Sequence, residues 1–323
     1  MGGVAAVAVL ATIVAAVLLF GDGGSGGPNG GSDNGPAQET AAVASAKDTG
    51  PVTVITDDPT CTAWASINNE LANSGQGLWN DRDRSIPASA WNPKQRAQFI
   101  AAGQSMRGAA AQTVGLVKLT PHRVMRELYQ QFIAYARAYT ERIPKYVPAD
   151  NNLAGAAYSA SSTLDSICAA IRDGSAAARG PLVSASPPPS EIAPVGNLAS
   201  PQIFLTSDNN VCPEWKAAVD RFGQQTAQWQ QLDPNIPSIY WNKEQKAVNY
   251  AAGPVMNSFA GKLEQLGRQS DNAVWQDLAN LAAQYRRAFV TALPTYTPTD
   301  NHLANAANFA SLIVLGGCAA VAE

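Results

Sequence analysis

Histidine and cysteine are scarce in this sequence. Its 323 residues contain two histidines and four cysteines, and no CxxC or HxxxH pair occurs among them. Zinc and iron–sulfur sites usually draw their ligands from such closely spaced pairs, so we expect no metal site. The glycines at positions 21, 23 and 26 match GxGxxG, but the sequence indicates neither a strand before them nor a helix after them. We therefore expect no nucleotide and no other cofactor.

Charged residues are also few, at 15% of the chain, and their signs nearly cancel. The sequence has 22 lysines and arginines against 25 aspartates and glutamates, for a net charge of −3. Nucleic-acid-binding proteins usually carry a clear basic excess. This balance excludes nucleic acid as an expected partner.

The motifs of common enzymes are missing as well. The sequence has no GxSxG, no SxxK with its partner motifs, no P-loop and no HExxH. His122 and His302 stand at positions that do not correspond between the two halves of the chain, and surface positions explain them better than general-base catalysis. We predict no catalytic residue and expect a non-enzymatic protein.

The chain begins with a long apolar run. Residues 4–20 read VAAVAVLATIVAAVLLF, and as a helix they span roughly 25 Å at about 1.5 Å per residue. We interpret residues 1–20 as a retained transmembrane anchor, because a signal peptide would show a basic start and a nearby cleavage site. A cleaved signal peptide and a buried core helix remain the alternatives.

A glycine-rich segment follows. Residues 21–36 read GDGGSGGPNGGSDNGP, and a polar composition continues to about Pro59. Such a composition offers few large apolar groups to compensate the entropy of ordering. Residues 21–59 are therefore expected to form a flexible tether.

The rest of the chain is a tandem duplication. Residues 86–170 and 236–320, aligned at a shift of 150 positions, are identical at 31 of 85 positions. Upstream, Cys61 and Trp64 correspond to Cys212 and Trp215 at a shift of 151. We delimit repeat domain 1 as residues 60–173 and repeat domain 2 as residues 211–323. The Pro/Ser-rich residues 174–210 form a linker, long enough for the repeats to pack together or to move independently.

Each repeat is predicted to contain four helices, so the fold is expected to be all-α, with one N-terminal transmembrane helix and two four-helix-bundle-like domains. Apolar residues recur at steps of three and four, and no segment of a repeat shows a sustained period of two. Asn92 and Gln95 form a capping-box pattern, with Pro93 at the first helical position. The N-cap residues expected for the second, third and fourth helices are Asn92, Thr120 and Asp150 in repeat 1 and Asn242, Ser270 and Asp300 in repeat 2.

The cysteines occupy equivalent positions in the two repeats. Cys61 and Cys212 start the first helix, and Cys168 and Cys318 lie near the end of the fourth. These points share one end of an up-down-up-down bundle, which favours the disulfides Cys61–Cys168 and Cys212–Cys318, although four cysteines allow three connectivities. Because disulfides persist in oxidising compartments, we expect the chain from about residue 21 onward on the extracytoplasmic side of the plasma membrane. Four buried free thiols are the alternative.

Eight residues that recur in both repeats are weak candidates for binding. A tryptophan could line a groove beside the long loop, an arginine could receive an anion, and the Tyr-x-Pro-x-Asp segment would suit a polar or saccharide contact. Each type also has a structural explanation, as a loop clamp, an ion-pair partner or a helix cap. The candidates are Trp91, Trp241, Arg137, Arg287, Tyr146, Tyr296, Asp150 and Asp300.

The layout of an Ala/Val-rich run at residues 4–20, the GDGGSGGPNGGSDNGP segment and an Ala-rich remainder with four cysteines resembles uncharacterised single-pass envelope proteins of mycobacteria and related actinobacteria. The resemblance covers mainly the first sixty residues and implies a cell-envelope setting. It transfers no functional residue.

Together these features predict a single-pass membrane protein that presents two helical bundles as a non-enzymatic binding or interaction module of the cell envelope. The expected partners are the membrane, through the N-terminal helix, and another envelope protein rather than a lipid or a saccharide. Two alternatives remain: an accessory scaffold subunit of a membrane complex, and a hydrolase or transferase that acts on envelope material at a site between the repeats.

Overall fold

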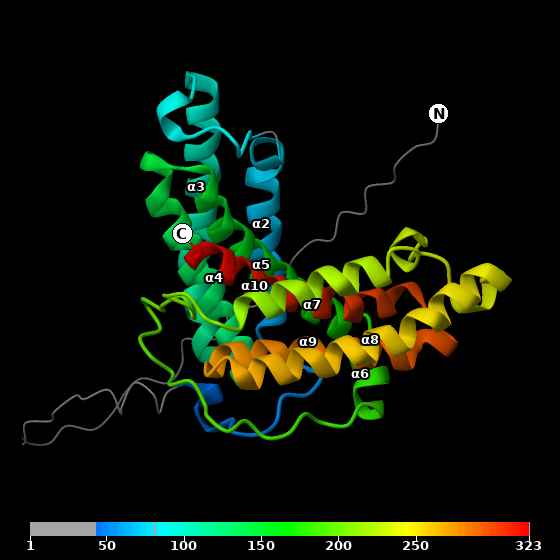
Figure 1. Ribbon diagram of the computed structural model, residues 1–323. Coiled ribbons are helices and arrows are strands. Elements are labelled where there is room, and N and C mark those ends of the chain that lie inside the picture. The colour runs from blue at the N-terminus through cyan, green and yellow to red at the C-terminus, as the bar shows by residue number, and fades with distance from the viewer. Residues whose placement is uncertain (1–42, 81, 323) are drawn as a thin grey trace, which may run out of the picture. The chain divides into compact units, whose positions relative to one another are not determined.

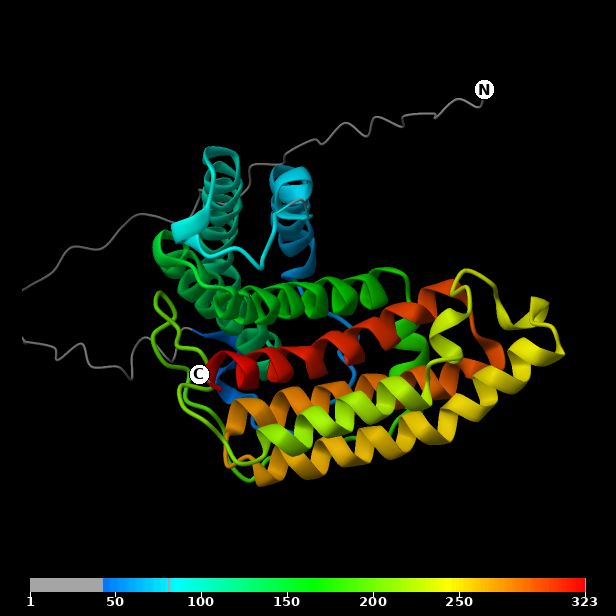
Figure 2. The same ribbon diagram turned by 45° about the horizontal axis from the view of Figure 1, so that its top comes forward.

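The computed structural model of the chain describes residues 43–80 and 82–322, and for residues 74–80 it describes the backbone alone. The predicted transmembrane helix at residues 1–20 and the first part of the predicted tether lie outside the described residues. Within the described ranges every regular element is helical (Figure 1, Figure 2). The prediction of an all-α fold is confirmed for this part of the chain.

Each repeat contains four long α-helices. In repeat 1 they are α2 (Cys61–Asn80), α3 (Pro93–Leu119), α4 (Arg123–Arg142) and α5 (Asn151–Arg172). In repeat 2 they are α7 (Cys212–Gln225), α8 (Lys243–Gln269), α9 (Ala273–Ala292) and α10 (Asn301–Val321). The short elements are η1 (Ala44–Lys47), η2 (Ala88–Ala90), η3 (Ile143–Lys145), η4 (Pro148–Asp150), α6 (Ser175–Arg179), η5 (Gly180–Leu182), η6 (Trp229–Gln231), η7 (Ser238–Tyr240), η8 (Leu293–Thr295) and η9 (Pro298–Asp300). The bounds of α3 and α4 fall on those of α8 and α9 at the shift of 150 residues found in the sequence.

The predicted capping boxes begin α3 and α8. The Asn92 side chain accepts a hydrogen bond from the Gln95 N–H at 2.9 Å, and the Asn92 N–H donates to the Gln95 side chain at 3.0 Å. Asn242 and Gln245 form the same pair at 2.8 and 2.9 Å. Two orphan donors at each helix start are satisfied in this way, which confirms the predicted starts.

The predicted starts of the third helices are wrong by two residues. The N-cap residues of α4 and α9 are His122 and Asn272, and the Asn272 side chain accepts a hydrogen bond from the Trp275 N–H at 3.0 Å. Thr120 and Ser270 instead end the preceding helices, because each donates its backbone N–H to the carbonyl four residues earlier. Their backbones therefore belong to the second helix of each repeat.

The two repeats pack against each other through equivalent helices and fall within one compact unit. The contact between α5 and α10 is the most extensive among the described helices, and α4 also contacts α9. The polar contacts are reciprocal: Asn152 of α5 donates to the Ala319 carbonyl, and His302 of α10 bonds to Asp173 just after α5. Because residues 152 and 302 correspond, the repeats meet as the subunits of an isologous dimer do.

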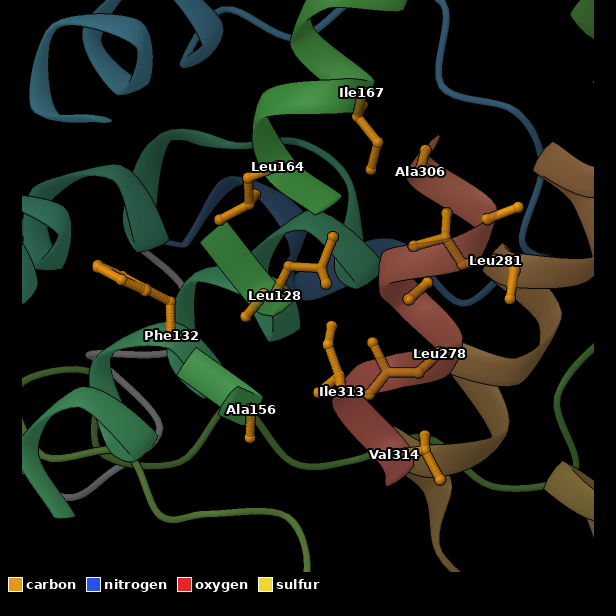
Figure 3. Close-up of a cluster of buried hydrophobic side chains, with 14 of the residues drawn as sticks. Leu128, Phe132, Ala156, Leu164, Ile167, Leu278, Leu281, Ala306, Ile313 and Val314 are labelled. Atoms are coloured by element: carbon orange, nitrogen blue, oxygen red, sulfur yellow. The ribbon is translucent and has the colours of Figure 1, made fainter. Parts of the chain in front are cut away.

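Figure 3 shows the apolar side chains at this junction. Leu128 and Ile167 of repeat 1 lie toward Leu278 and Ile313 of repeat 2, and all four are fully buried. Small residues allow the close approach of α5 and α10: a Cβ added to Gly316 would lie 3.1 Å from the backbone of α5. The repeats therefore share one apolar core.

Residues 43–59, expected to end a flexible tether, lie against the helices instead. Val43, Val52, Val54 and Ile55 are all buried in the core. The tether prediction is therefore wrong for this segment, because four large aliphatic side chains provide enough apolar surface to hold it on the bundle.

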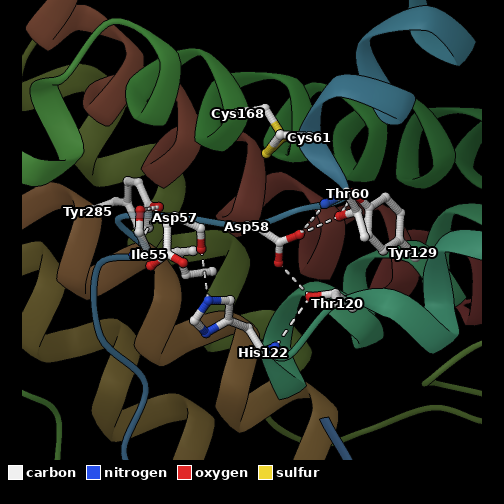
Figure 4. Close-up of a disulfide and its surroundings, with 10 residues drawn as sticks. All are labelled: Ile55, Asp57, Asp58, Thr60, Cys61, Thr120, His122, Tyr129, Cys168 and Tyr285. Atoms are coloured by element: carbon white, nitrogen blue, oxygen red, sulfur yellow. Dashed lines mark hydrogen bonds between the residues drawn. A yellow bond between two sulfur atoms is a disulfide. The ribbon is translucent and has the colours of Figure 1, made fainter. Parts of the chain in front are cut away.

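Polar contacts hold the same segment to both repeats (Figure 4). The Ile55 N–H donates to the Tyr285 hydroxyl of repeat 2 at 3.2 Å. The Asp58 carboxylate accepts hydrogen bonds from the Thr60 N–H at 2.8 Å and from the Thr120 hydroxyl of repeat 1 at 2.5 Å. The segment thus bridges the two repeats.

The linker at residues 174–210 is also held by contacts with the repeats. Arg179 of α6 forms two hydrogen bonds of 3.0 Å with the Asp300 carboxylate of repeat 2. The Phe204 ring lies edge-on to Tyr135 of repeat 1 and to Trp275 of repeat 2. Of the two arrangements that the linker length allows, the repeats adopt the packed one.

The two disulfides join Cys61 to Cys168 and Cys212 to Cys318, the pairs favoured by the bundle topology (Figure 4 shows the first). Each connects the start of a first helix with the end of a fourth, at a sequence separation of 107 or 106 residues. In the chain-entropy account a loop of this length contributes up to ~4.7 kcal/mol, and ~2–4 kcal/mol is typical. The disulfides therefore supply a large part of the stability of each repeat.

One helix among the described residues, Pro298–Val321, is long and apolar enough to span a membrane. Half of its most apolar window is buried inside the protein. It includes α10, which packs on α5 and carries Cys318. The junction between the repeats accounts for its apolar composition.

Candidate functional site

Trp91 and Tyr146, both binding candidates from the sequence, pack together in repeat 1. The Trp91 ring stacks on Phe99 at 4.1 Å and on Tyr146 at 5.6 Å between centroids. The Trp91 Nε1–H donates to the Ile86 carbonyl, and the Tyr146 hydroxyl to the Arg84 carbonyl, both at 2.8 Å. Burial raises the pKa of Tyr146 to about 12. This ring cluster holds the loop before α3 onto the bundle.

Trp241 and Tyr296 repeat this arrangement in repeat 2. Their rings stack at 5.5 Å, the Trp241 Nε1–H donates to the Ile236 carbonyl at 2.8 Å, and the Tyr296 hydroxyl donates to the Pro234 carbonyl at 2.6 Å. The groove expected between the loop and the second helix is thus filled by these rings in both repeats.

Asp150 and Asp300 organise the starts of the fourth helices. Each accepts a hydrogen bond from the backbone N–H three residues before it, from Val147 at 2.8 Å and from Thr297 at 2.9 Å. The Asp300 carboxylate also forms an ion pair with Arg179 of the linker. Both carboxylates are buried and internally bonded.

Arg137 and Arg287 contact different parts of the chain. Arg137 donates to the Ala199 carbonyl of the linker at 2.5 Å. Arg287 forms two hydrogen bonds with Glu264, at 2.5 and 2.8 Å, beside a hollow of about 460 Å³ that linker residues also line. All eight sequence candidates therefore make internal contacts, and the two arginines are not brought together.

A larger cleft, of about 550 Å³, opens where α2, α3, α4 and α5 of repeat 1 meet α10 of repeat 2. Met106 and Phe132 of its lining are buried, whereas Tyr158 is 54% exposed. The Tyr158 ring lies edge-on to Phe309 at 5.9 Å, which gives the cleft an aromatic wall shared by both repeats. The polar lining includes Asn68, Ser105, Ser162, Asp165, His302 and Asn305. None of the eight sequence candidates lines this cleft.

His302 is the cleft residue best suited to act as a base. Its Nε2 lies 3.0 Å from Asp173, and Arg172 holds the same carboxylate with hydrogen bonds of 2.8 and 2.9 Å. These hydrogen bonds, above all those from Arg172, lower the pKa of Asp173. Within residues 43–322 as described, no serine hydroxyl hydrogen-bonds to His302, and no three His, Cys, Asp or Glu side chains converge as metal ligands.

A second exposed feature lies on η7 and α8 in repeat 2. Ile239, Tyr240 and Tyr250 are 77%, 72% and 50% exposed. At the positions that correspond to Ile239 and Tyr240, repeat 1 carries the small residues Ser89 and Ala90. We refer to Ile239, Tyr240 and Tyr250 as the η7 surface.

A charged cluster is buried between α4 and α9. Arg123 Nε lies 2.6 Å from Asp277 Oδ2, and these side chains are 2% and 1% exposed. Arg126 and Glu127 lie beside them, 3.6 Å apart. Glu127 corresponds to Asp277 at the shift of 150, so equivalent carboxylates face each other across the junction. Burial, and then repulsion from Asp277, raise the pKa of Glu127 well above its usual range.

Sequence reasoning missed the cleft because its candidates were residues shared by the two repeats. The polar cleft residues differ between them: Ser162 corresponds to Leu312 and Asp165 to Leu315. The signal was present in the sequence as positions where one repeat is polar and the other aliphatic.

Comparison with known proteins connects the chain to mycobacteria. Residues 43–323 match the family model described as "Mycobacterial ESX-1 associated protein". A protein of Mycolicibacterium smegmatis (strain MKD8), described as uncharacterised, is 44% identical over an alignment of 334 positions that covers 100% of this chain and 86% of the relative. No solved structure matches the chain. Both matches are mycobacterial, as the resemblance of the N-terminal layout implies.

Proposed function

The chain belongs to the family of mycobacterial ESX-1 associated proteins, and we propose that it is a membrane-anchored, extracytoplasmic interaction module that works with the ESX-1 secretion system. In this proposal the module is non-enzymatic, and its partner is another envelope protein. The family description supports the connection with the secretion system.

The proposed location follows from the cysteines and the N-terminal sequence. Two disulfides that use all four cysteines favour an oxidising compartment. The uncharged residues 4–20 are long enough to cross a bilayer, and the glycine-rich residues 21–36 would separate the helical body from it. These features support a single-pass anchor at the plasma membrane.

The η7 surface carries the proposal of a protein partner. Ile239 and Tyr240 are adjacent in the chain and are the two most exposed large hydrophobic side chains among the described residues. Neighbouring exposed apolar side chains are typical of interaction sites, and tyrosine is enriched in interfaces. Lys243 and Lys246 share a helix face with Tyr250, so the apolar side chains are accompanied by positive charge. This composition suits a partner with an apolar contact surface and an acidic rim.

The proposal is tested by affinity purification of the tagged full chain from gently solubilised mycobacterial membranes. We expect components of the secretion system to co-purify in fixed stoichiometry. The double variant Ile239→Ser, Tyr240→Ala, which installs the residues of repeat 1, should reduce their recovery about tenfold or more. Leu119→Ala is the matched control, because Leu119 is 60% exposed on a different helix. The proposal would be refuted if the double variant and the native chain recovered equal amounts of secretion-system components, or if no secretion-system component co-purified with the native chain.

A hydrolase acting on envelope material is the second candidate, favoured by one observation. His302, Ser162 and Ser166 line the same cleft, and the imidazole is oriented by Asp173. Nucleophilic catalysis needs a hydroxyl within hydrogen-bond reach of the base, and Ser166 instead donates to the Ser162 carbonyl at 2.7 Å. Hydrolysis of an ester or glycoside by the purified chain, abolished in His302→Ala, would favour this candidate over the interaction module.

A further inference from the structure

The cleft lies beside Leu71, a position at which repeat 2 carries one ring of an aromatic pair. In repeat 2 the rings of Phe222 and Phe259 stack between α7 and α8, 4.3 Å apart and nearly parallel. The corresponding residues of repeat 1 are Leu71 and Ala109, whose side chains are much smaller. The same helical framework thus forms with or without the rings, so the space beside Leu71 is not a requirement of the fold.

The residues that line the cleft in repeat 1 also differ in polarity from their counterparts in repeat 2. Four polar lining residues of repeat 1 correspond to aliphatic residues of repeat 2. The pairs are Asn68 and Val219, Ser105 and Val255, Ser162 and Leu312, and Asp165 and Leu315. Because repeat 2 folds with aliphatic residues at all four positions, packing of the helices does not require the polar set of repeat 1, and these side chains are available to a ligand.

The chemistry of the lining selects the ligand class. Among the described residues, no lysine or arginine lines the cleft, and the Asp165 carboxylate adds negative charge, so phosphates and other anions are disfavoured. The side chains of Ser162, Asp165 and Asn305 form no hydrogen bond with the rest of the described chain, and together they offer hydroxyl, carboxylate and amide groups. Tyr158 and Phe309 add exposed aromatic surface on one wall. Hydrogen-bond donors and acceptors beside an aromatic wall suit a neutral, polyhydroxylated molecule.

We propose that the cleft between repeat 1 and α10 binds a neutral saccharide. Its volume of about 550 Å³ lies within the ~300–1,000 Å³ usual for small-molecule sites. The sugar hydroxyls bond to Ser162, Asp165 and Asn305, and the apolar face of a ring packs on Tyr158. The site combines residues of both repeats, so it forms only in the packed arrangement. It is separate from the η7 surface and does not depend on the partner proposed there.

The test is titration of the purified, disulfide-intact chain with neutral mono-, di- and trisaccharides of glucose, galactose, arabinose and N-acetylglucosamine, followed by calorimetry and by the NMR signals of the tyrosine rings. We expect at least one of these probes to bind and inorganic phosphate not to bind. The double variant Ser162→Leu, Asp165→Leu, which installs the residues of repeat 2, should weaken binding about tenfold or more. Its thermal midpoint should stay close to that of the native chain, because repeat 2 accepts these residues.

The control variant is Tyr240→Ala, which removes part of the η7 surface and should leave saccharide affinity unchanged. Absence of binding for every saccharide of the panel would overturn the proposal, as would equal affinity of the native chain and the Ser162→Leu, Asp165→Leu variant. Binding of a peptide segment in the cleft, with no saccharide bound, would assign the cleft to a protein partner and would also overturn it.

Discussion

The buried pair of Arg123 and Asp277 offers the sharpest test of the junction between the repeats. The Arg123 guanidinium donates to the Asp277 carboxylate at 2.6 and 3.1 Å, and also to the carbonyls of Asp48 and Gly50. In Arg123→Leu the Asp277 carboxylate remains buried near Glu127 without this cation. In Asp277→Leu the guanidinium keeps the two carbonyls and the Asp48 carboxylate, 3.8 Å away, and loses its two hydrogen bonds to Asp277.

Each single substitution is expected to lower the free energy of unfolding by about 3–5 kcal/mol, the usual cost of leaving one member of a buried ion pair alone. In the double variant Arg123→Leu, Asp277→Leu no unpaired charge remains at these two positions. The Asp48 and Gly50 carbonyls lose a donor, and the Asp48 carboxylate loses the cation that lies 3.8 Å from it. We expect the double variant to lose about 1–3 kcal/mol. The coupling between the two sites is therefore about 3 kcal/mol or more.

The assay is urea unfolding of the four proteins with both disulfides intact, monitored by tryptophan fluorescence and circular dichroism. The exposed pair Lys216–Asp220, 2.6 Å apart with side chains 65% and 50% exposed, is the control, and its coupling should stay below about 1 kcal/mol. Additivity of the Arg123 and Asp277 substitutions within about 0.5 kcal/mol would refute the view that this pair joins the repeats.

Three further predictions concern single features of the fold. Because the pKa of Glu127 is raised in the folded chain, the unfolded chain loses the Glu127 proton at a lower pH than the folded chain does, above about pH 4.3. The free energy of unfolding should therefore fall as the pH rises from there through the raised pKa. We expect Glu127→Gln to remove this fall, as measured by urea unfolding between pH 4 and 8. Parallel pH curves for the two proteins would contradict the assignment. The variant Cys61→Ser, Cys168→Ser should lose ~2–4 kcal/mol of unfolding free energy in the same assay, and an unchanged midpoint would count against the disulfide. Gly317→Ala would place a Cβ 2.7 Å from a tyrosine hydroxyl of α4 and should cost about 1–3 kcal/mol, whereas Gly261→Ala, with nothing within 4 Å, should cost nothing; equal midpoints would contradict the close packing.

The features that the sequence could predict depend on local patterns. The capping boxes at Asn92 and Asn242 need only a side chain and a backbone group three residues apart, so their sequence signature is complete. The disulfide pairs followed from the order of four helices. The third-helix starts were misplaced because Thr120 is a good N-cap residue by type, and its use by the preceding helix depends on the backbone path.

The remaining features depend on contacts between distant segments. The tether boundary is wrong because Val52, Val54 and Ile55 stand among polar residues in the sequence, and their burial depends on distant segments, such as Tyr285 beside Ile55 and Gly180 beside Val54. The proximity of Glu127 and Asp277 could not be predicted, because it depends on the packing of α4 against α9. The cleft could be found in the sequence only by comparing positions that differ between the repeats, and its lining combines residues of four helices of repeat 1 with residues of α10.

The two repeats form one body, each closed by its own disulfide, and we propose that this body lies outside the cytoplasm. Peptide mapping tests this arrangement most directly: free thiols of mycobacterial cells that produce the full chain are alkylated before lysis, and the purified protein is digested without reduction. We expect cross-linked peptides that contain Cys61 with Cys168 and Cys212 with Cys318, and no alkylated cysteine. A peptide that links Cys61 to Cys318, or alkylation of all four thiols, would contradict this arrangement.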